Sequence, residues 1–135
     1  MDCKGAVEEL ERAIEDLKER NRDTPILVEG EKDVKALHAL GITGTILTVY
    51  RGKEIANMCD DIASRYREII LLTDWDSEGW YLFRRIEKNL SGRTRCIADY
   101  RLIFAKNAMV KDVESLPSFL STLHAKMRGE RKFDE

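Results

Sequence analysis

The sequence predicts an α/β fold: a compact parallel four-stranded sheet with helices on both faces, flanked by N- and C-terminal helices. Short β-rich runs at 26–28, 45–49, 68–73 and 94–98 alternate with segments of helical periodicity. The clearest of these runs are continuously apolar, which is typical of strands that are covered on both faces. Strands separated by helices pair in parallel, through right-handed crossovers.

The helices follow from the spacing of their apolar residues. Ile55, Met58, Cys59 and Ile62 recur every three or four residues, as the buried stripe of a helix does. Gly41 ends an earlier helix, because glycine readily adopts the left-handed conformation that stops one. The helices expected between and after the strands are Glu31–Leu40, 55–66, Ser77 or Glu78 to Leu90, and about Pro117 to Met127.

A further amphipathic helix is expected over 3–21. Its apolar positions form a narrow stripe in a charged background: Val7, Leu10, Ile14 and Leu17. Such a stripe either caps the chain's own sheet or pairs with a second copy, so we consider a homodimer or a larger assembly. The expected organisation is an N-terminal helix, 1–22, and one domain, 23–135, with a C-terminal helical extension.

Length and composition limit the kinds of protein that the chain can be. Its 135 residues suffice for one domain with an ordinary core. No apolar run approaches the roughly 20 residues that span a bilayer, and the first helix is too charged for a secretory signal, so we expect a cytoplasmic protein without a membrane partner. Cys3, Cys59 and Cys96 are too far apart in sequence for a compact zinc site.

Carboxylates follow two of the predicted strands. Glu29 ends the first strand, and Asp74 and Asp76 end the third, with Trp75 between them pointing away. If these strands are neighbours, the three carboxylates converge at the carboxyl edge of the sheet, where such folds bind ligands. Because clustered carboxylates repel each other, a divalent cation would stabilise them, and few oxygen ligands suit Mg²⁺, for which Mn²⁺ can substitute. Gly30 is expected to let the backbone turn tightly into the next helix.

At these residues the sequence resembles the Toprim domain, which topoisomerases, bacterial-type primases and several nucleases share. VEGEKDVKALHALGI, with Glu29, Gly30 and Asp33, is similar to the first motif of the family, and TDWDSEG, with Asp74 and Asp76, is similar to the second. The whole chain looks most like the small stand-alone archaeal members. The resemblance implies a Rossmann-like fold and a Mg²⁺ site on nucleic acid, with Glu29 as general acid/base and Asp74 and Asp76 as metal ligands, all three catalytic.

Departures from the family narrow the expected activity. Trp80 stands where topoisomerases have a glutamate, and the chain carries neither a strand gate nor the zinc-binding and template-binding regions of a primase. We therefore expect metal-dependent cleavage or transfer of a phosphodiester, most plausibly in RNA but otherwise in DNA. The alternative is a non-catalytic module that binds Mg²⁺ and nucleic acid within a larger complex.

Three other interpretations of the carboxylates stay open. An EF-hand loop would place Arg85 where the bidentate glutamate belongs, which disfavours it. An aspartyl-phosphate phosphatase would use Asp74 as a nucleophile, although that motif usually lies near the start of a chain. Finally, the carboxylates could be purely structural, with Asp76 capping the helix that follows it.

The charges point to one surface that faces phosphate. The net charge is −2, yet residues 84–111 carry eight basic side chains against two acidic ones: Arg84, Arg85, Lys88, Arg93, Arg95, Arg101, Lys106 and Lys111 against Glu87 and Asp99. The expected nucleic-acid contacts are Arg84, Arg85 and Lys88, together with Arg51 after the second strand. Trp80 could stack an unpaired base, but we expect it to pack against the sheet, because it begins the apolar stripe of its helix.

Overall fold

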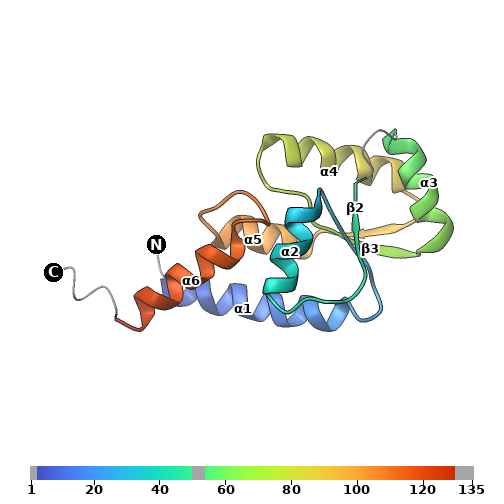
Figure 1. Cartoon of the computed structure of the whole chain (residues 1–135). Coiled ribbons are helices and arrows are strands. Elements are labelled where there is room, and N and C mark those ends of the chain that lie inside the picture. The colour runs from blue at the N-terminus through green and yellow to red at the C-terminus, as the bar shows by residue number, and fades with distance from the viewer. Residues whose placement is uncertain (1–2, 50–53, 130–135) are drawn as a thin grey trace.

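The computed structural model describes residues 3–49 and 54–129 and confirms the predicted fold class (Figure 1). Its elements are α1 (Cys3–Arg20), β1 (Ile26–Val28), α2 (Glu31–Ala39), β2 (Ile46–Thr48), α3 (Ile55–Arg65), β3 (Glu68–Leu71), α4 (Ser77–Leu90), β4 (Arg95–Ile97), α5 (Asp99–Asn107) and α6 (Leu116–Met127). All of these elements except α5 lie close to predicted ranges, and the last predicted helix begins one residue early.

The four strands form a parallel sheet in the order β2-β1-β3-β4. β1 and β3 are therefore neighbours in the centre, with Ile26 paired with Ile70 and Leu27 paired with Leu71. This register brings the residues after Val28 and after Leu71 to the same edge of the sheet. The condition for convergence of the predicted carboxylates is thus met.

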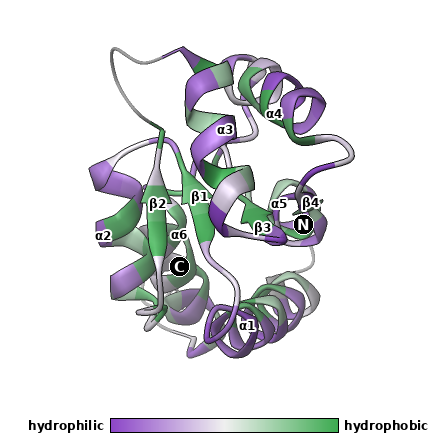
Figure 2. Ribbon diagram, turned by 90° about the vertical axis from the view of Figure 1, so that its right-hand side faces the viewer, coloured by the Kyte–Doolittle hydropathy of each residue, from purple (hydrophilic) through white to green (hydrophobic). Residues whose placement is uncertain are grey.

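The two central strands divide their side chains between two cores, because successive residues of a strand point to opposite faces. Leu27, Ile69 and Leu71 pack with α3 and α4, whereas Ile26 and Ile70 pack with the other helices. Figure 2 shows the resulting layers, with α3 and α4 on one side of the strands and α1, α2 and α6 on the other. Both faces are covered, as the apolar runs predict.

The winding of the chain reverses between β1 and β3. The helix after β1 is α2, which covers one face, and the helix after β3 is α4, which covers the other. The connections at the carboxyl ends of these strands consequently diverge. This is the position at which open parallel sheets bind ligands.

The N-terminal stripe is part of the chain's own core. Val7, Leu10, Ile14 and Leu17 are at most 6% exposed and cluster with residues of β1, α5 and α6. Of the two alternatives for this stripe, capping is therefore the one observed, and the stripe is not free to form a coiled coil. The oligomeric state of the protein and the division at residue 22 stay predictions.

Helix α5 is missing from the sequence-based expectation. Its buried residues, Tyr100, Arg101 and Phe104, include a cation, and its apolar Leu102 is 65% exposed. The apolar residues thus give no clean stripe, and hydrophobic periodicity does not reveal the helix. Across residues 3–49 and 54–129, no helix has the length and apolar character needed to cross a membrane.

Truncation of the fully buried Leu10 tests the role of α1 in the core. We expect Leu10→Ala to lower the free energy of unfolding by roughly 2–5 kcal/mol, the usual cost of removing a buried leucine side chain. Leu102→Ala is the matched control, because the same truncation at an exposed position should cost little. Urea denaturation measures both, and a similar small change for the two variants would contradict the capping role.

Candidate functional site

Glu29 and Asp74 are joined directly across the two central strands. The backbone N–H of Asp74 donates a hydrogen bond of 2.9 Å to Oε2 of Glu29. Register alone brings the two residues to one edge, and this bond fixes the carboxylate of the first against the backbone of the second. The first two carboxylates predicted from the sequence therefore belong to one site.

Asp76 lies at the start of α4 and caps it. Its Oδ1 accepts a hydrogen bond of 2.7 Å from the backbone N–H of Gly79. The structural role considered for this residue is therefore real, but it occupies only one of its two carboxylate oxygens. The capping bond also holds the side chain at the carboxyl edge of the sheet, since α4 begins there.

The two glycines of the motifs have different roles, and that of Gly30 differs from the expectation. Gly30 has an extended backbone with φ −161°, which any residue adopts, so the predicted tight turn is not the reason for this glycine. A Cβ atom on Gly79, by contrast, would lie 1.9 Å from the carbonyl oxygen of Asp74. The turn that carries both aspartates thus requires a residue without a side chain at position 79.

The connection between α5 and α6 contacts the site, although it lies far from Asp74 in the sequence. The backbone N–H of Val113 donates to Oδ1 of Asp74 over 3.0 Å, and that of Trp75 donates to the carbonyl of Lys111 over 2.9 Å. The Trp75 ring turns away from the carboxylates, as predicted, and packs against Phe104 with 6.0 Å between ring centroids. These contacts fix Asp74 from the side opposite Glu29.

Arg101 binds the backbone of the turn that carries the two aspartates. Its position differs from the one predicted from the sequence. We expected it on a phosphate-facing surface, but only 6% of it is exposed. Its Nε donates to the carbonyl of Thr73 over 3.1 Å and its Nη2 to that of Asp74 over 2.8 Å. A basic residue in a charged stretch gives no sign in the sequence that it will be buried, so this role could not be foreseen.

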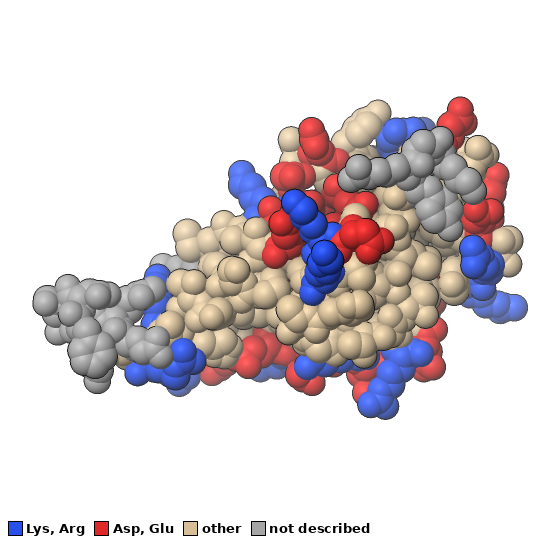
Figure 3. Space-filling model, in the orientation of Figure 1, with Lys and Arg blue, Asp and Glu red and all other residues tan. Residues whose placement is uncertain are grey.

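Burial raises the pKa values of the clustered acids. Desolvation is the main cause that raises the pKa of Asp74 to about 7. The hydrogen bond from Val113, next in size, lowers this pKa, and the neighbouring charge of Glu29 raises it. Desolvation is also the main cause of the raised pKa values of Glu29 and Asp33. Asp112, on the connection after α5, adds charge to the same cluster. Figure 3 shows acidic side chains gathered on this face of the molecule.

Each of the three predicted ligands keeps an oxygen for another partner. One oxygen of Glu29, Asp74 and Asp76 accepts a backbone N–H, and no described residue donates to the other. The side chains are not gathered as closely as in a loaded centre, since no group of three His, Cys, Asp or Glu within residues 3–49 and 54–129 forms a complete metal-binding set. The donors are of the type that Mg²⁺ prefers.

The three carboxylates lie within a stretch of sequence that matches a known domain family. Residues 24–107 match the Toprim domain family. The chain belongs to the Toprim family. It is also 36% identical to a UPF0292 protein of Thermoplasma volcanium over 73% of this chain and 84% of that protein. A UPF0292 protein of Pyrococcus furiosus is 30% identical over 94% of this chain and 95% of that protein.

A solved structure of a protein from Aquifex aeolicus has the same fold. It superposes with a TM-score of 0.68 and 26% sequence identity, over 78% of this chain and 95% of that chain. The resemblance to small archaeal Toprim proteins is therefore confirmed. Family membership points to a metal-binding function related to nucleic acid, without naming the metal or the reaction.

The basic residues predicted to contact nucleic acid lie along α4, which leads away from the Toprim carboxylates. Arg84, Arg85 and Lys88 are exposed on this helix. Arg51 lies outside the described residues. Trp80 does not pack against the sheet as expected, because it is 49% exposed on the first turns of α4. The apolar stripe of the helix begins at Gly79 and Phe83 instead.

Glycine substitutions test how the aspartate turn of the Toprim site is held. Helix propensity alone predicts that Gly79→Ala would stabilise α4 by about 1 kcal/mol. The contact of 1.9 Å between the new Cβ and the carbonyl oxygen of Asp74 predicts the opposite, because backbone must move to relieve it. We expect Gly79→Ala to lower the melting temperature and Gly30→Ala, whose Cβ meets nothing within 4 Å, to change it little. A stabilised Gly79→Ala protein would show that the turn is not under this constraint.

Neutralisation of Asp74 tests the repulsion within the cluster. With a folded-state pKa of about 7 against an ordinary value of 3.8, folded Asp74 keeps a proton that the unfolded chain has lost between those pH values. The free energy of unfolding therefore falls as pH rises through this window and stays low above it. In the presence of EDTA, Asp74→Asn should stabilise the protein by about 1–2 kcal/mol near pH 8, a value reduced for solvent screening, and by less near pH 5.

Urea denaturation at the two pH values measures this difference. Asp23→Asn, at an exposed position before β1, is the control for removing one negative charge. An Asp74→Asn protein that is less stable than wild type near pH 8 would mean that the carboxylate is a net stabilising group.

Proposed function

We propose that this Toprim protein is a metal-dependent enzyme that cleaves or transfers phosphodiester bonds in nucleic acid, with RNA favoured over DNA. The observation that supports it is the placement of Glu29, Asp74 and Asp76 at the carboxyl ends of β1 and β3, where the winding reverses. Partly buried acids at such a position raise each other's pKa values and destabilise the fold without a counter-charge. Acidic groups with raised pKa values are common at functional sites.

The donor set fits Mg²⁺, and Mn²⁺ can take its place. Three carboxylates, each with an oxygen outside any hydrogen bond with described residues, supply hard ligands and leave positions for water or phosphate. When bound, such a cation polarises a phosphoryl oxygen and lowers the pKa of water. Asp74 and Asp76 are the proposed ligands, because backbone N–H groups already orient both side chains.

Glu29 is the proposed general acid/base as well as a ligand. Its Oε2 is held by the backbone N–H of Asp74, which leaves Oε1 to accept or return a proton. Desolvation raises its pKa above the ordinary value of a glutamate, and a raised pKa suits a group that must change protonation state during a reaction. Arg101 keeps the turn in place through the two carbonyls that it binds, and it is a positioning residue in this scheme.

The basic residues of α4 are proposed to hold the substrate, with Arg51 as a further phosphate contact. A protein that acts on nucleic acid in this way is proposed to work in the cytoplasm. A second candidate function is a non-catalytic Toprim module within a larger assembly. The capping bond of Asp76 supports it, because this bond gives the carboxylate a structural role that involves no catalysis.

Metal response and cleavage separate these candidates. Mg²⁺ or Mn²⁺ should raise the melting temperature of wild type, because ligands that bind only the native state stabilise it. Asp74→Asn combined with Asp76→Asn should lose that rise, whereas Glu8→Gln combined with Asp23→Asn, two exposed positions, should keep it. Labelled structured RNA, single-stranded DNA and duplex DNA, incubated with each metal, report cleavage on gels.

Glu29→Gln serves to separate binding from reaction. We expect at least a hundredfold slower cleavage than wild type, since a positioned acid/base typically contributes about 10²–10⁴-fold. An unchanged metal response in the double Asp→Asn variant would contradict the metal site. Binding of nucleic acid and metal without cleavage of any substrate would favour the non-catalytic module.

A further inference from the structure

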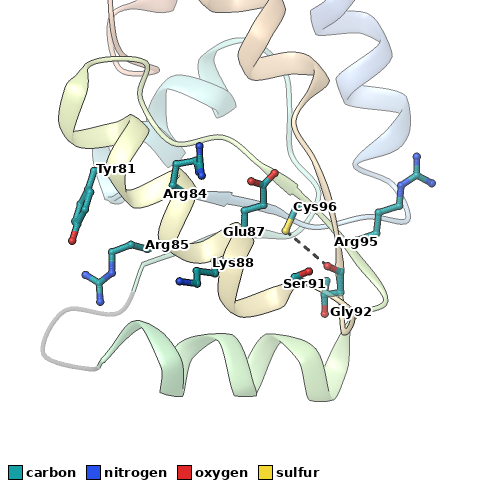
Figure 4. A pocket seen from close by; sticks show the side chains of 10 residues that line it. Tyr81, Arg84, Arg85, Glu87, Lys88, Ser91, Gly92, Arg95 and Cys96 are labelled. Atoms are coloured by element: carbon teal, nitrogen blue, oxygen red, sulfur yellow. Dashed lines mark hydrogen bonds between the residues drawn. The ribbon is translucent and has the colours of Figure 1, made fainter.

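A groove runs along α4, away from the carboxylates, toward the beginning of β4 (Figure 4). Its volume is about 610 Å³, and four basic side chains line it against one acidic side chain, Glu87. The basic residues are Arg84, Arg85, Lys88 and Arg95. In a chain whose net charge is −2, this is a local concentration of positive charge in a concave surface. Such a groove attracts a polyanion.

Two exposed aromatic side chains lie where α4 leaves the carboxylates. Trp80 is 49% exposed and Tyr81 is 66% exposed, and Tyr81 also lines the groove. Each ring has an arginine one helical turn further on: the Arg84 guanidinium is 5.5 Å from the Trp80 ring, and that of Arg85 is 5.8 Å from the Tyr81 ring. Phe83 stacks on Trp80 with 5.7 Å between centroids. These contacts limit the conformations that the exposed rings can adopt.

We propose that α4 and the beginning of β4 form a track for single-stranded nucleic acid. Unpaired bases stack on Trp80 and Tyr81, and the phosphates lie in the basic groove. The inference rests on the proposed function and deepens it, because it names the substrate class as an unpaired strand. Exposed aromatic rings combined with a basic groove are the recurring means by which proteins bind single strands.

The aromatic residues distinguish this ligand from a duplex. A duplex keeps its bases stacked on one another and presents only backbone to a protein groove, so Trp80 and Tyr81 would contribute little to its binding. A single strand exposes base faces that gain by stacking on the rings. The same two residues would also contribute little to an acidic peptide, which needs only the cations.

The length of α4 determines how long a bound single strand of nucleic acid must be. Trp80 and Lys88 are eight residues apart, so the first aromatic ring of the track and the last basic residue of α4 are separated by about 12 Å along the helix axis. A strand that occupies both must extend over several nucleotides. Affinity should therefore rise with oligonucleotide length and level off once the strand spans this distance.

Fluorescence anisotropy in EDTA tests the track without metal or catalysis. The probes are labelled oligonucleotides of graded length without self-structure, as RNA and as DNA, and a duplex of the same sequence. We expect at least roughly tenfold tighter binding of the single strands, and a loss of roughly tenfold or more in affinity for Trp80→Ala combined with Tyr81→Ala. The triple variant Arg84→Ser, Arg85→Ser, Lys88→Ser should flatten the dependence of affinity on salt.

Matched controls separate the track from general surface effects. Leu102→Ala with Met109→Ala removes exposed apolar side chains outside the groove, and Arg12→Ser with Arg22→Ser and Lys126→Ser removes three exposed cations outside it. Both should bind like wild type. Circular dichroism and melting curves check that every variant folds.

Two results would overturn the inference: equal affinity for duplex and single strand with no effect of the aromatic substitutions, or displacement of the strand by a poly-glutamate peptide at similar concentration. Single-strand binding that needs Trp80 and Tyr81, in a protein that cleaves nothing with Mg²⁺, would support the track and contradict the proposed function. Cleavage of duplex alone would do the reverse.

Discussion

The turn from Thr73 to Gly79 is the constraint on which the site depends. It brings two carboxylates to the end of a central strand and then starts a helix, within a space that admits no Cβ at Gly79. The hydroxyl of Thr73 donates to the carbonyl of Gly79 over 2.8 Å, and Arg101 donates to the carbonyls of Thr73 and Asp74. Each of these bonds satisfies a polar group in a buried or partly buried region, where an unpaired group would cost about 1–3 kcal/mol. The turn is rigid because its polar groups have protein partners on several sides.

This arrangement opposes stability in one respect. Desolvation lowers the pKa of Arg101, whereas the charges of Glu29, Asp74 and Asp76 raise it, so its guanidinium is the nearby counter-charge of the cluster. The pKa values of Glu29 and Asp74 are raised even with this cation nearby. A core that only needed to fold would replace these groups with apolar ones at little cost. Retaining them is more simply explained by chemistry at this edge than by the stability of the fold.

The sequence predicts most of the fold and the acidic part of the site. Four β-rich runs and the helices between them predict a parallel sheet, whereas the adjacency of β1 and β3 was only a condition and is supplied by the structure. Glu29, Asp74 and Asp76 could be proposed from the sequence because they follow two apolar runs, whose carboxyl ends form the ligand-binding edge of a parallel sheet. Gly79 needed the three-dimensional structure, since its close neighbour is a carbonyl five residues earlier and no pattern encodes that contact.

Residues that depend on tertiary packing could not be predicted. Helix α5 buries an arginine and exposes a leucine, the reverse of what periodicity assumes, and the Val113 bond to Asp74 joins positions that are 39 residues apart. Trp80 was expected inside, because an aromatic residue at the start of an apolar stripe is usually buried.

Helix α4 combines two roles: it begins at the carboxylates, and, because Trp80 is exposed, it presents side chains that can hold a single strand. Its first residues carry the cap at Asp76, and its outward side carries Trp80, Tyr81, Arg84 and Arg85. Because the helix is rigid, a strand held by these side chains has a fixed position relative to the carboxylates. The acids alone would repel the phosphates of that strand, whereas the groove attracts them. Under the proposed function, binding at both places requires that a cation first neutralise the negative charge of the cluster, so metal binding and placement of the substrate are coupled.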